Sequence, residues 1–163
     1  QVFGRGFERD GQESDYYSFV HKGVRFVAAC DAGSGGDHVG HWCSELIAPA
    51  GQCEWLEQEL TQPEPVILFA HIPPERDGAD RNMYLSRTDS RWFCDLVTRH
   101  TPQAMFFGHL HRATEEYRIG ATRCFNVSSC CWNAGRAPLG FLHVRVTPAG
   151  LHVREMETGR YSS

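Results

Sequence analysis

The sequence of 163 residues lacks long apolar runs and any excess of positive charge. Its longest apolar runs, residues 26–30 and 66–70, are far shorter than the roughly 20 residues that span a bilayer. Acidic residues number 20 against 16 basic ones, which leaves a formal charge of −4. Because nucleic acids and anionic membranes attract basic surfaces, this balance indicates neither of them as a partner.

Two common binding motifs are also missing. The seven cysteines include no Cys-x-x-Cys pair, which excludes a zinc ribbon and a thioredoxin-like motif. The glycine-rich residues 33–36 are not followed by Gly-Lys-Ser/Thr, so they do not form a P-loop. Several cysteines lie in apolar stretches, where a reduced cysteine acts as a small hydrophobic residue. We therefore expect a reducing compartment and a cytoplasmic location.

The amino-acid composition is typical of a globular protein. Hydrophobic residues make up 41% and charged residues 22%, values that argue against intrinsic disorder. There is no internal repeat and no clear linker, and a chain of this length usually folds as one domain. We therefore treat residues 1–163 as a single domain.

Runs of apolar, aromatic and β-branched residues predict a sheet. Residues 16–19 and 24–30 are two such runs, joined by the turn sequence His21-Lys22-Gly23. Residues 66–70 and 104–107 are continuous apolar runs, which are typical of strands buried on both faces. Further strands are expected at residues 117–119, 122–127, 141–146 and 151–155, so the C-terminal region is β-rich.

Helical spacing of apolar residues predicts helices between the first strands. One helix covers residues 52–60. A second follows the candidate N-caps Thr88, Asp89 and Ser90 and ends before Pro102. The alternation of strands and helices favours an α/β fold with parallel strands.

Three histidines follow two of the predicted buried strands. His71 comes directly after residues 66–70, and His109 and His111 come after residues 104–107. Because the carboxyl ends of parallel strands meet at one edge of a sheet, we expect these side chains to lie close together. Neutral imidazole is a common ligand of zinc, iron and similar metals. A single His after a strand is usually an ordinary polar residue, but the combination indicates a metal site.

The residues around these histidines resemble a known family. Phe69-Ala70-His71-Ile72-Pro73-Pro74 and Gly108-His109-Leu110-His111 are similar to the last two metal-binding motifs of the calcineurin-like metallophosphoesterases. Further likeness lies in Tyr16-Tyr17-Ser18-Phe19, in Gly23-Val24-Arg25-Phe26 and in the helix at residues 52–60, so the resemblance extends over the chain. The resemblance implies a four-layer α/β/β/α sandwich fold. It also implies an enzyme that hydrolyses phosphate mono- or diesters of small molecules, cyclic nucleotides among them.

The resemblance also implies that part of the site is missing. The family's site uses five motifs, and the first three are absent upstream of Tyr16. We therefore expect an incomplete, C-terminal portion of such an enzyme, inactive by itself, with the general-acid His in the missing part. No catalytic residue is identified within the chain. In the intact protein, His71 and His109 would bind one divalent ion of the Mn, Fe or Zn type and His111 a second one.

Two other functions stay open. Three His side chains can hold a single zinc ion with an open position, as in a mononuclear zinc hydrolase. A non-catalytic binding or interaction domain is the other alternative.

Other polar residues are weaker candidates for the site. Asp37, His38 and His41 lie in a long loop in which no helix or strand fixes their geometry. Asp31 follows a predicted strand and is expected to support the site without binding metal.

Three further expectations concern positions around the predicted strands. His143 and His152 alternate with apolar residues and are expected to face outward. Gly108 would let the backbone pass close to the site. The loop at residues 75–87 is expected to border the substrate pocket.

Overall fold

A six-stranded mixed sheet forms the centre of the molecule. The computed structural model describes residues 7–9, 12–14, 16–32, 39–42, 51–76 and 81–159. The strand order is β3-β4-β5-β6-β8-β7. The strands are β3 (Tyr17–His21), β4 (Val24–Ala28), β5 (Val66–Phe69), β6 (Ala104–Phe107), β7 (Glu115–Ile119) and β8 (Thr122–Asn126). β4, β5, β6 and β8 are parallel, whereas the outer strands β3 and β7 pair antiparallel. The predicted parallel arrangement is confirmed.

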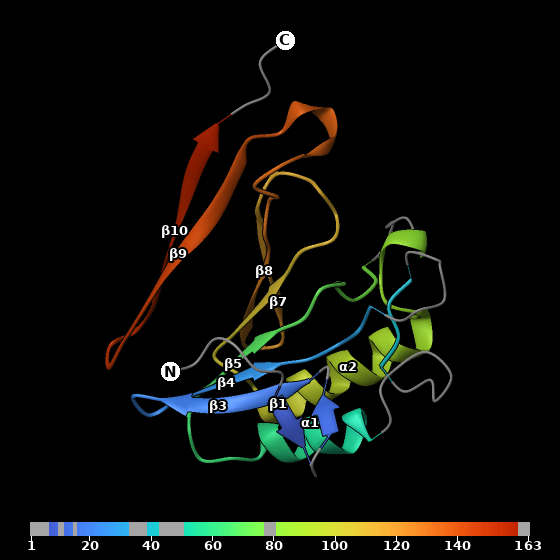
Figure 1. The fold of residues 1–163 in the computed structure, drawn as a ribbon, viewed down its shortest axis with the longest axis vertical. Helices are drawn as coiled ribbons and strands as arrows, with labels where there is room; N and C mark the ends of the chain where they lie inside the picture. The colour runs from blue at the N-terminus through green and yellow to red at the C-terminus, as the bar shows by residue number, and fades with distance from the viewer. Residues whose placement is uncertain are drawn as a thin grey trace.

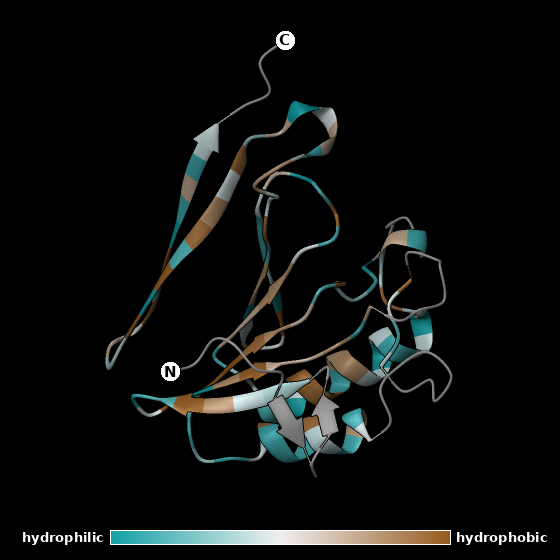
Figure 2. Ribbon diagram, viewed as in Figure 1, coloured by the Kyte–Doolittle hydropathy of each residue, from teal (hydrophilic) through white to brown (hydrophobic). Residues whose placement is uncertain are grey.

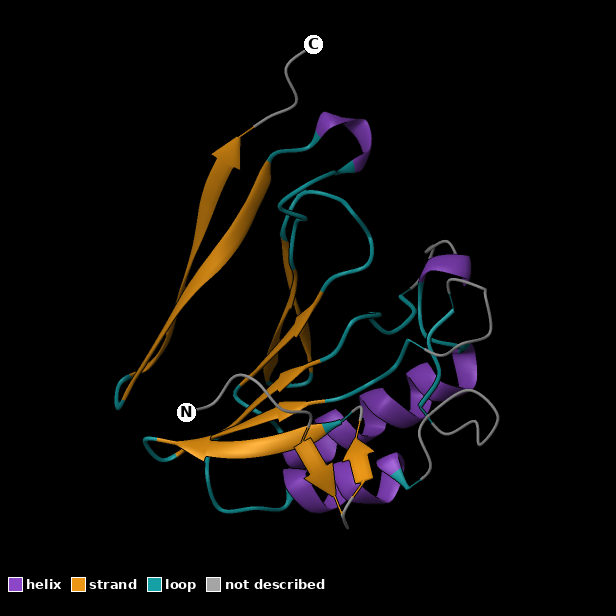
Figure 3. Cartoon of the chain, viewed as in Figure 1, coloured by secondary structure: helices purple, strands orange, loops and turns teal. Residues whose placement is uncertain are grey.

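Two antiparallel hairpins accompany this sheet. β9 (Leu139–Thr147) pairs with β10 (Gly150–Gly159), and near the N-terminus β1 (Phe7–Arg9) pairs with β2 (Gln12–Ser14). Short 3-10 turns lie at η1 (Arg81–Met83) and η2 (Ala134–Arg136). Figure 3 shows how strands dominate the C-terminal part of the chain. The fold is therefore of the mixed α/β class with a β-rich C-terminal region, as the sequence predicts.

The helices and the β9–β10 hairpin lie on opposite faces of the central sheet (Figure 1). Helices α1 (Gln52–Leu60) and α2 (Arg87–His100) pack against one face, with Leu56, Phe93 and Leu96 fully buried. Apolar residues of the hairpin, such as Val144, pack against Ile67 and Phe106 on the other face. Figure 2 shows the hydrophobic strands enclosed between these layers. The order of layers is α/β/β, and a fourth, helical layer is not found in the part of the chain that the structure describes.

Helix α2 begins earlier than its predicted caps. Its N-cap is Ser86, whose hydroxyl oxygen accepts a hydrogen bond from the backbone N–H of Asp89 at 3.1 Å. The same hydroxyl donates to the Asp89 carboxylate at 2.7 Å. This pairing of an N-cap with an acidic residue three positions later is a strong helix start, so the expectation that Thr88, Asp89 or Ser90 caps the helix is wrong.

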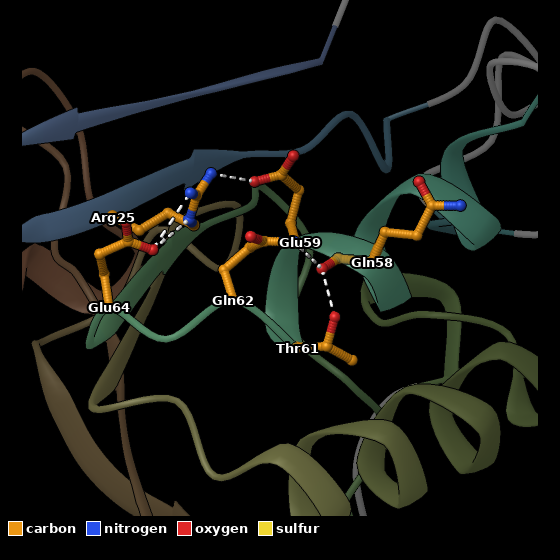
Figure 4. Close-up of polar contacts among 6 residues, drawn as sticks. All are labelled: Arg25, Gln58, Glu59, Thr61, Gln62 and Glu64. Carbon is orange, nitrogen blue, oxygen red and sulfur yellow. Dashed lines mark hydrogen bonds and ion pairs between the residues drawn. The ribbon is translucent and has the colours of Figure 1, made fainter.

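An ion cluster joins strand β4 to the end of helix α1 (Figure 4). The Arg25 guanidinium donates to Glu59 at 2.7 Å and to Glu64 at 3.1 Å. The three side chains are partly exposed, at 15% for Arg25, 16% for Glu59 and 28% for Glu64. The C-terminal end of α1 is therefore attached to the sheet by charge as well as by apolar packing.

A row of phenylalanine rings crosses the sheet on the side of the hairpin. Neighbouring rings stack with centroids 5.1–6.5 Å apart; the five residues are Phe19, Phe26, Phe69, Phe106 and Phe125. The hairpin covers one end of the row, where Phe106 is 7% exposed. Phe69 is 42% exposed, so the expectation that residues 66–70 are buried on both faces is wrong at that position.

The described cysteines differ in their bonding. Cys30, Cys94, Cys124, Cys130 and Cys131 are not in disulfides, whereas Cys53 is in one. The reducing compartment inferred from the sequence stays a prediction. Within the described ranges, neither helix combines the length and the apolar character that crossing a bilayer requires.

Candidate metal site

The parallel pairing of β5 and β6 brings His71 and His109 together. Phe69 lies opposite Phe106 in this pair, and each histidine follows a few residues later. The pairing continues beyond the strands, because the N–H of Gly108 donates to the carbonyl of His71 at 3.0 Å. The Nε2 atom of His71 is 3.2 Å from the Nδ1 atom of His109, and the rings meet edge to face. The predicted proximity of the two strand ends is observed.

The separation of these nitrogens fits a shared metal ion. Two nitrogens that bind one tetrahedral ion at about 2.0–2.1 Å lie about 3.3–3.4 Å apart. The observed 3.2 Å between His71 and His109 is close to that value, and it equally suits a hydrogen bond between the two rings. The described residues hold no group of three or more His, Cys, Asp or Glu side chains placed to bind one ion. The pair therefore offers two of the ligands that a metal needs.

His111 is held by a neighbouring loop. Its Nδ1 atom is 2.7 Å from the backbone carbonyl of Trp132, and its ring lies 5.0 Å from the Trp132 ring. Because a carbonyl only accepts, Nδ1 carries the proton, and in the neutral ring this tautomer leaves the lone pair on Nε2. Metal-binding histidines are commonly oriented in this way. His111 does not complete a three-residue group with His71 and His109.

The backbone that presents these histidines is strained. His109 has φ 67° and His111 has φ 47°, in the left-handed region that non-glycine residues rarely adopt. The N–H of Leu110 also donates to the carbonyl of Gly108 at 2.8 Å, which closes a tight turn around His109. Each such residue costs of order 1–3 kcal/mol, and strain of this kind is concentrated at functional sites.

Gly108 is not required by lack of space. A Cβ atom placed at this position would lie 3.5 Å from the His71 Nδ1 atom, an ordinary van der Waals contact. The expectation that a glycine is needed there for close backbone approach is therefore wrong. A close approach occurs instead at Gly40, where a Cβ would lie 2.9 Å from the Cβ of Ile72.

The Asp31 carboxylate supports the turn that follows β5. It is 1% exposed, and its oxygens accept hydrogen bonds from the N–H groups of His71 at 3.0 Å and Ile72 at 2.9 Å. Burial raises the pKa of Asp31 to about 7, although these two donors act in the opposite direction. Its partners are backbone groups, which agrees with the supporting role expected for it.

The electrostatics favour neutral imidazole at His71. Desolvation and, to a smaller extent, the electrostatic interaction with the neighbouring His111 ring hold the pKa of His71 below its ordinary value. Neutral imidazole is the form that binds metals.

The weaker candidates are placed elsewhere. His41 lies 3.5 Å from the Asp89 carboxylate at the start of α2, and Asp37 and His38 fall outside the described residues. His143 and His152 are exposed on the β9–β10 hairpin, facing outward as predicted.

The loop at residues 75–87 borders a different hollow, which has a volume of about 400 Å³. Residues 77–80 of this loop are not described. The walls of the hollow are Glu75, Arg76, Arg87, Ser90, Arg91, Cys94 and Asp95. None of the three candidate histidines lines it, so its expected role beside the substrate remains a prediction.

The sequence reasoning missed the loop that contacts His111. Trp132 lies on this loop, and the buried side chain of Asn133 fixes the loop's shape. A large aromatic residue in an otherwise polar segment was the available signal, but its position beside His111 depends on the pairing of β6 with β8.

Comparison with known proteins identifies similar folds at low sequence identity. No protein-family model and no curated protein matches the chain. A purple acid phosphatase from yellow lupin (Lupinus luteus) seeds matches with a TM-score of 0.56 and 14% identity, over 98% of this chain and 34% of that one. GAP50 of Plasmodium, described as the anchor in the inner membrane complex, matches with 0.59 and 12%, over 87% and 49%.

A third similar structure is a putative 5'-nucleotidase from Staphylococcus aureus, solved in complex with alpha-ketoglutarate. It matches with a TM-score of 0.50 and 15% identity, over 93% of this chain and 30% of that one. The chain thus spans between a third and a half of the first two structures. These similarities show that the chain shares the mixed α/β fold of these structures, two of which are described as a phosphatase and a putative nucleotidase.

Proposed function

We propose that the chain is part of a metal-dependent hydrolase of phosphate mono- or diesters, of the calcineurin-like type. The observation that carries this proposal is the 3.2 Å separation of the His71 and His109 ring nitrogens at the carboxyl ends of two adjacent parallel strands. The phosphoesterase-type fold supports it. In the intact protein, small-molecule phosphate esters are the substrates and two ions of the Mn, Fe or Zn type are the cofactors.

Each residue of the site has a distinct part in this proposal. His71 and His109 would hold one ion, and His111 would bind a second through its Nε2 atom. When bound, divalent ions polarise a phosphoryl oxygen and lower the pKa of a coordinated water. Asp31 fixes the turn that carries His71, and the Trp132 carbonyl fixes the tautomer of His111. The remaining ligands and the general acid lie outside the described residues.

A direct test measures metal binding by the 163-residue chain. Isothermal titration with Zn²⁺ and with Mn²⁺ compares the wild type with His71→Ala and His109→Ala. His152→Ala is the matched control, because His152 is an exposed histidine on the hairpin. We expect each site variant to weaken binding at least 10-fold, since ligand loss costs far more than loss of a surface side chain. Equal affinity of His109→Ala and His152→Ala would refute the metal site.

Activity is tested in the full-length protein that contains this chain. His109→Ala should lower the turnover of a phosphate ester by at least about 100-fold while His152→Ala leaves it unchanged. Metal analysis of the same protein separates the proposed two-ion centre from a mononuclear zinc hydrolase, because a single tightly held ion contradicts the former.

A non-catalytic binding role is the second candidate. The similarity to GAP50, an anchor protein, and the lack of a third ligand in the described residues favour it. Full turnover in His109→Ala, or no turnover in the wild type with intact metal binding, would support this alternative.

A further inference from the structure

Trp132 is the exposed aromatic residue that touches the candidate metal site. It is 53% exposed, and its ring centroid lies 5.0 Å from that of His111 at an angle of 48°. Among the described residues, the other exposed large hydrophobic side chains are Phe19, Val20, Phe69 and Phe141. These lie on strands β3, β5 and β9. An indole ring kept half in water beside a polar site loses burial energy that a stacked ligand would restore.

The loop holds this ring in a fixed position. The Asn133 side chain, 2% exposed, accepts from the Ser129 N–H at 2.9 Å and donates to the carbonyls of Ser129 at 3.2 Å and Pro138 at 2.7 Å. The Ser129 hydroxyl accepts from the N–H of Cys131 at 3.2 Å. All four polar contacts lie within the loop, so little ordering remains to be done when a ligand binds.

Two further hydrogen bonds join the loop to His111, one at Trp132 itself and one at Ala134. The carbonyl of Trp132 accepts from the His111 ring, and the N–H of Ala134 donates to the His111 carbonyl, both at 2.7 Å. The backbone that carries the indole is therefore bonded directly to His111, and the two rings lie in contact. A phosphate group that reaches His111 would leave its ester substituent within reach of the indole face.

We propose that Trp132 is a stacking platform for a flat aromatic ring within the leaving group, so that the preferred substrates are nucleotides or aryl phosphates rather than alkyl phosphates. This inference rests on the proposed phosphoesterase function and defines its substrate class. The His111–Trp132 contact fixes the platform at the site, and the half-exposed ring face receives the aromatic group. Trp132 contributes to binding and is not a catalytic residue.

The test measures affinities on the full-length protein, loaded with Mn²⁺, for three probes: a nucleoside monophosphate, phenyl phosphate and glycerol phosphate. Trp132→Ala should weaken binding of the two aromatic probes by about 5- to 150-fold, the range for stacking of a base on an aromatic side chain, and reduce the preference over glycerol phosphate by the same factor. Trp132→Phe should restore most of that preference. Phe141→Ala, an exposed aromatic residue on β9, is the matched control and should change nothing.

Fluorescence provides a second readout, because Trp42 and Trp55 are buried and Trp92 is partly buried, while Trp132 is 53% exposed. A stacked nucleobase should quench the emission of the wild type, and this quenching should disappear in Trp132→Phe.

An equal loss of affinity for aromatic and alkyl probes in Trp132→Ala, or quenching that persists in Trp132→Phe, overturns the stacking role. Failure of Mn²⁺ to bind the wild type instead contradicts the proposed function, so the two failures are distinguishable. The aromatic probe that binds more tightly separates nucleotides from aryl phosphates.

Discussion

The position of His71 depends on a buried carboxylate 40 residues earlier in the chain. Asp31 occupies the space behind the turn after β5 and pairs with the N–H groups of His71 and Ile72. The Ile72 N–H is shielded from water, so no solvent acceptor is available to it. A buried donor left without an acceptor costs about 1–3 kcal/mol. The geometry of the candidate metal pair is thus tied to a residue that is not itself a proposed ligand.

Asp31→Ala should therefore destabilise the fold by about 1–3 kcal/mol, since the desolvation penalty of the two N–H groups exceeds the gain from no longer burying the carboxyl. Urea unfolding measured at pH 6 checks the stability, and Zn²⁺ titration should show at least several-fold weaker binding. Asp95→Ala, on the exposed side of α2, is the control and should change neither quantity. Unaltered Zn²⁺ affinity in Asp31→Ala would mean that the turn keeps its shape without the carboxylate.

Single residues differ in how far the sequence foretells their positions. His71 and His109 were predictable as neighbours because each directly follows a short apolar run, and parallel pairing then brings both to one edge. Trp132 was not, because it reaches His111 through the loop after β8, and loop conformation depends on side-chain hydrogen bonds such as those of Asn133. Asp31 was correctly expected to be a supporting residue, but its two backbone partners follow only from the structure.

At the scale of elements, helix α1 is attached to strand β4 through the Arg25 cluster. The guanidinium contacts Glu59 within the helix and Glu64 just beyond it. The backbone N–H of Glu64 itself and, next in size, the Arg25 guanidinium hold the pKa of Glu64 below its ordinary value. A carboxyl whose pKa is lowered by folding stabilises the protein above its unfolded-state pKa, and this stabilisation is lost as the pH falls through the folded-state pKa.

Arg25→Met should lower stability at pH 7 and weaken its acid dependence. The pair with Glu59 contributes about 0.5–1 kcal/mol, the upper part of the range for partly exposed ion pairs. Urea midpoints of the wild type should fall between pH 5 and pH 3, and those of Arg25→Met should start lower and fall less. Arg99→Met removes the more exposed pair with Glu57 and serves as the control. Parallel pH profiles for Arg25→Met and the wild type would contradict the role of the cluster.

The ends of elements were harder to predict than their existence. Helix α1 covers residues 52–60 as expected from its apolar spacing, and β6 covers residues 104–107. For α2, three polar residues in a row offered equivalent caps, and the actual cap, Ser86, lies just before them. Ser86 is selected because its hydroxyl pairs with Asp89 three positions later, and because Ser90 is already bonded to Glu75 and Leu85.

At the scale of the whole molecule, the β9–β10 hairpin covers only part of the central sheet. Its apolar side chains contact Ile67, Phe106 and Phe125. Phe69, directly opposite Phe106 on the same face, remains 42% exposed. The sequence of β5 gives no sign of this difference, because four consecutive apolar residues look alike whether or not another layer covers the last one. The hairpin residues that cover this sheet lie more than 70 positions after Phe69 in the chain. The local periodicity of β5 therefore does not indicate which of its residues are covered.

Phe69 and Phe106 offer a matched test of this layering. They face each other across β5 and β6, and each stacks on two neighbouring phenylalanine rings. Phe106→Ala removes a ring enclosed by the hairpin and should cost about 3–5 kcal/mol of unfolding free energy, because a cavity remains. Phe69→Ala should cost less than half as much, since water already reaches that ring and no closed cavity forms. Urea unfolding of both variants under the same conditions measures the difference. Equal losses would mean that the face over Phe69 is as enclosed in solution as the face over Phe106, which contradicts the partial coverage by the hairpin.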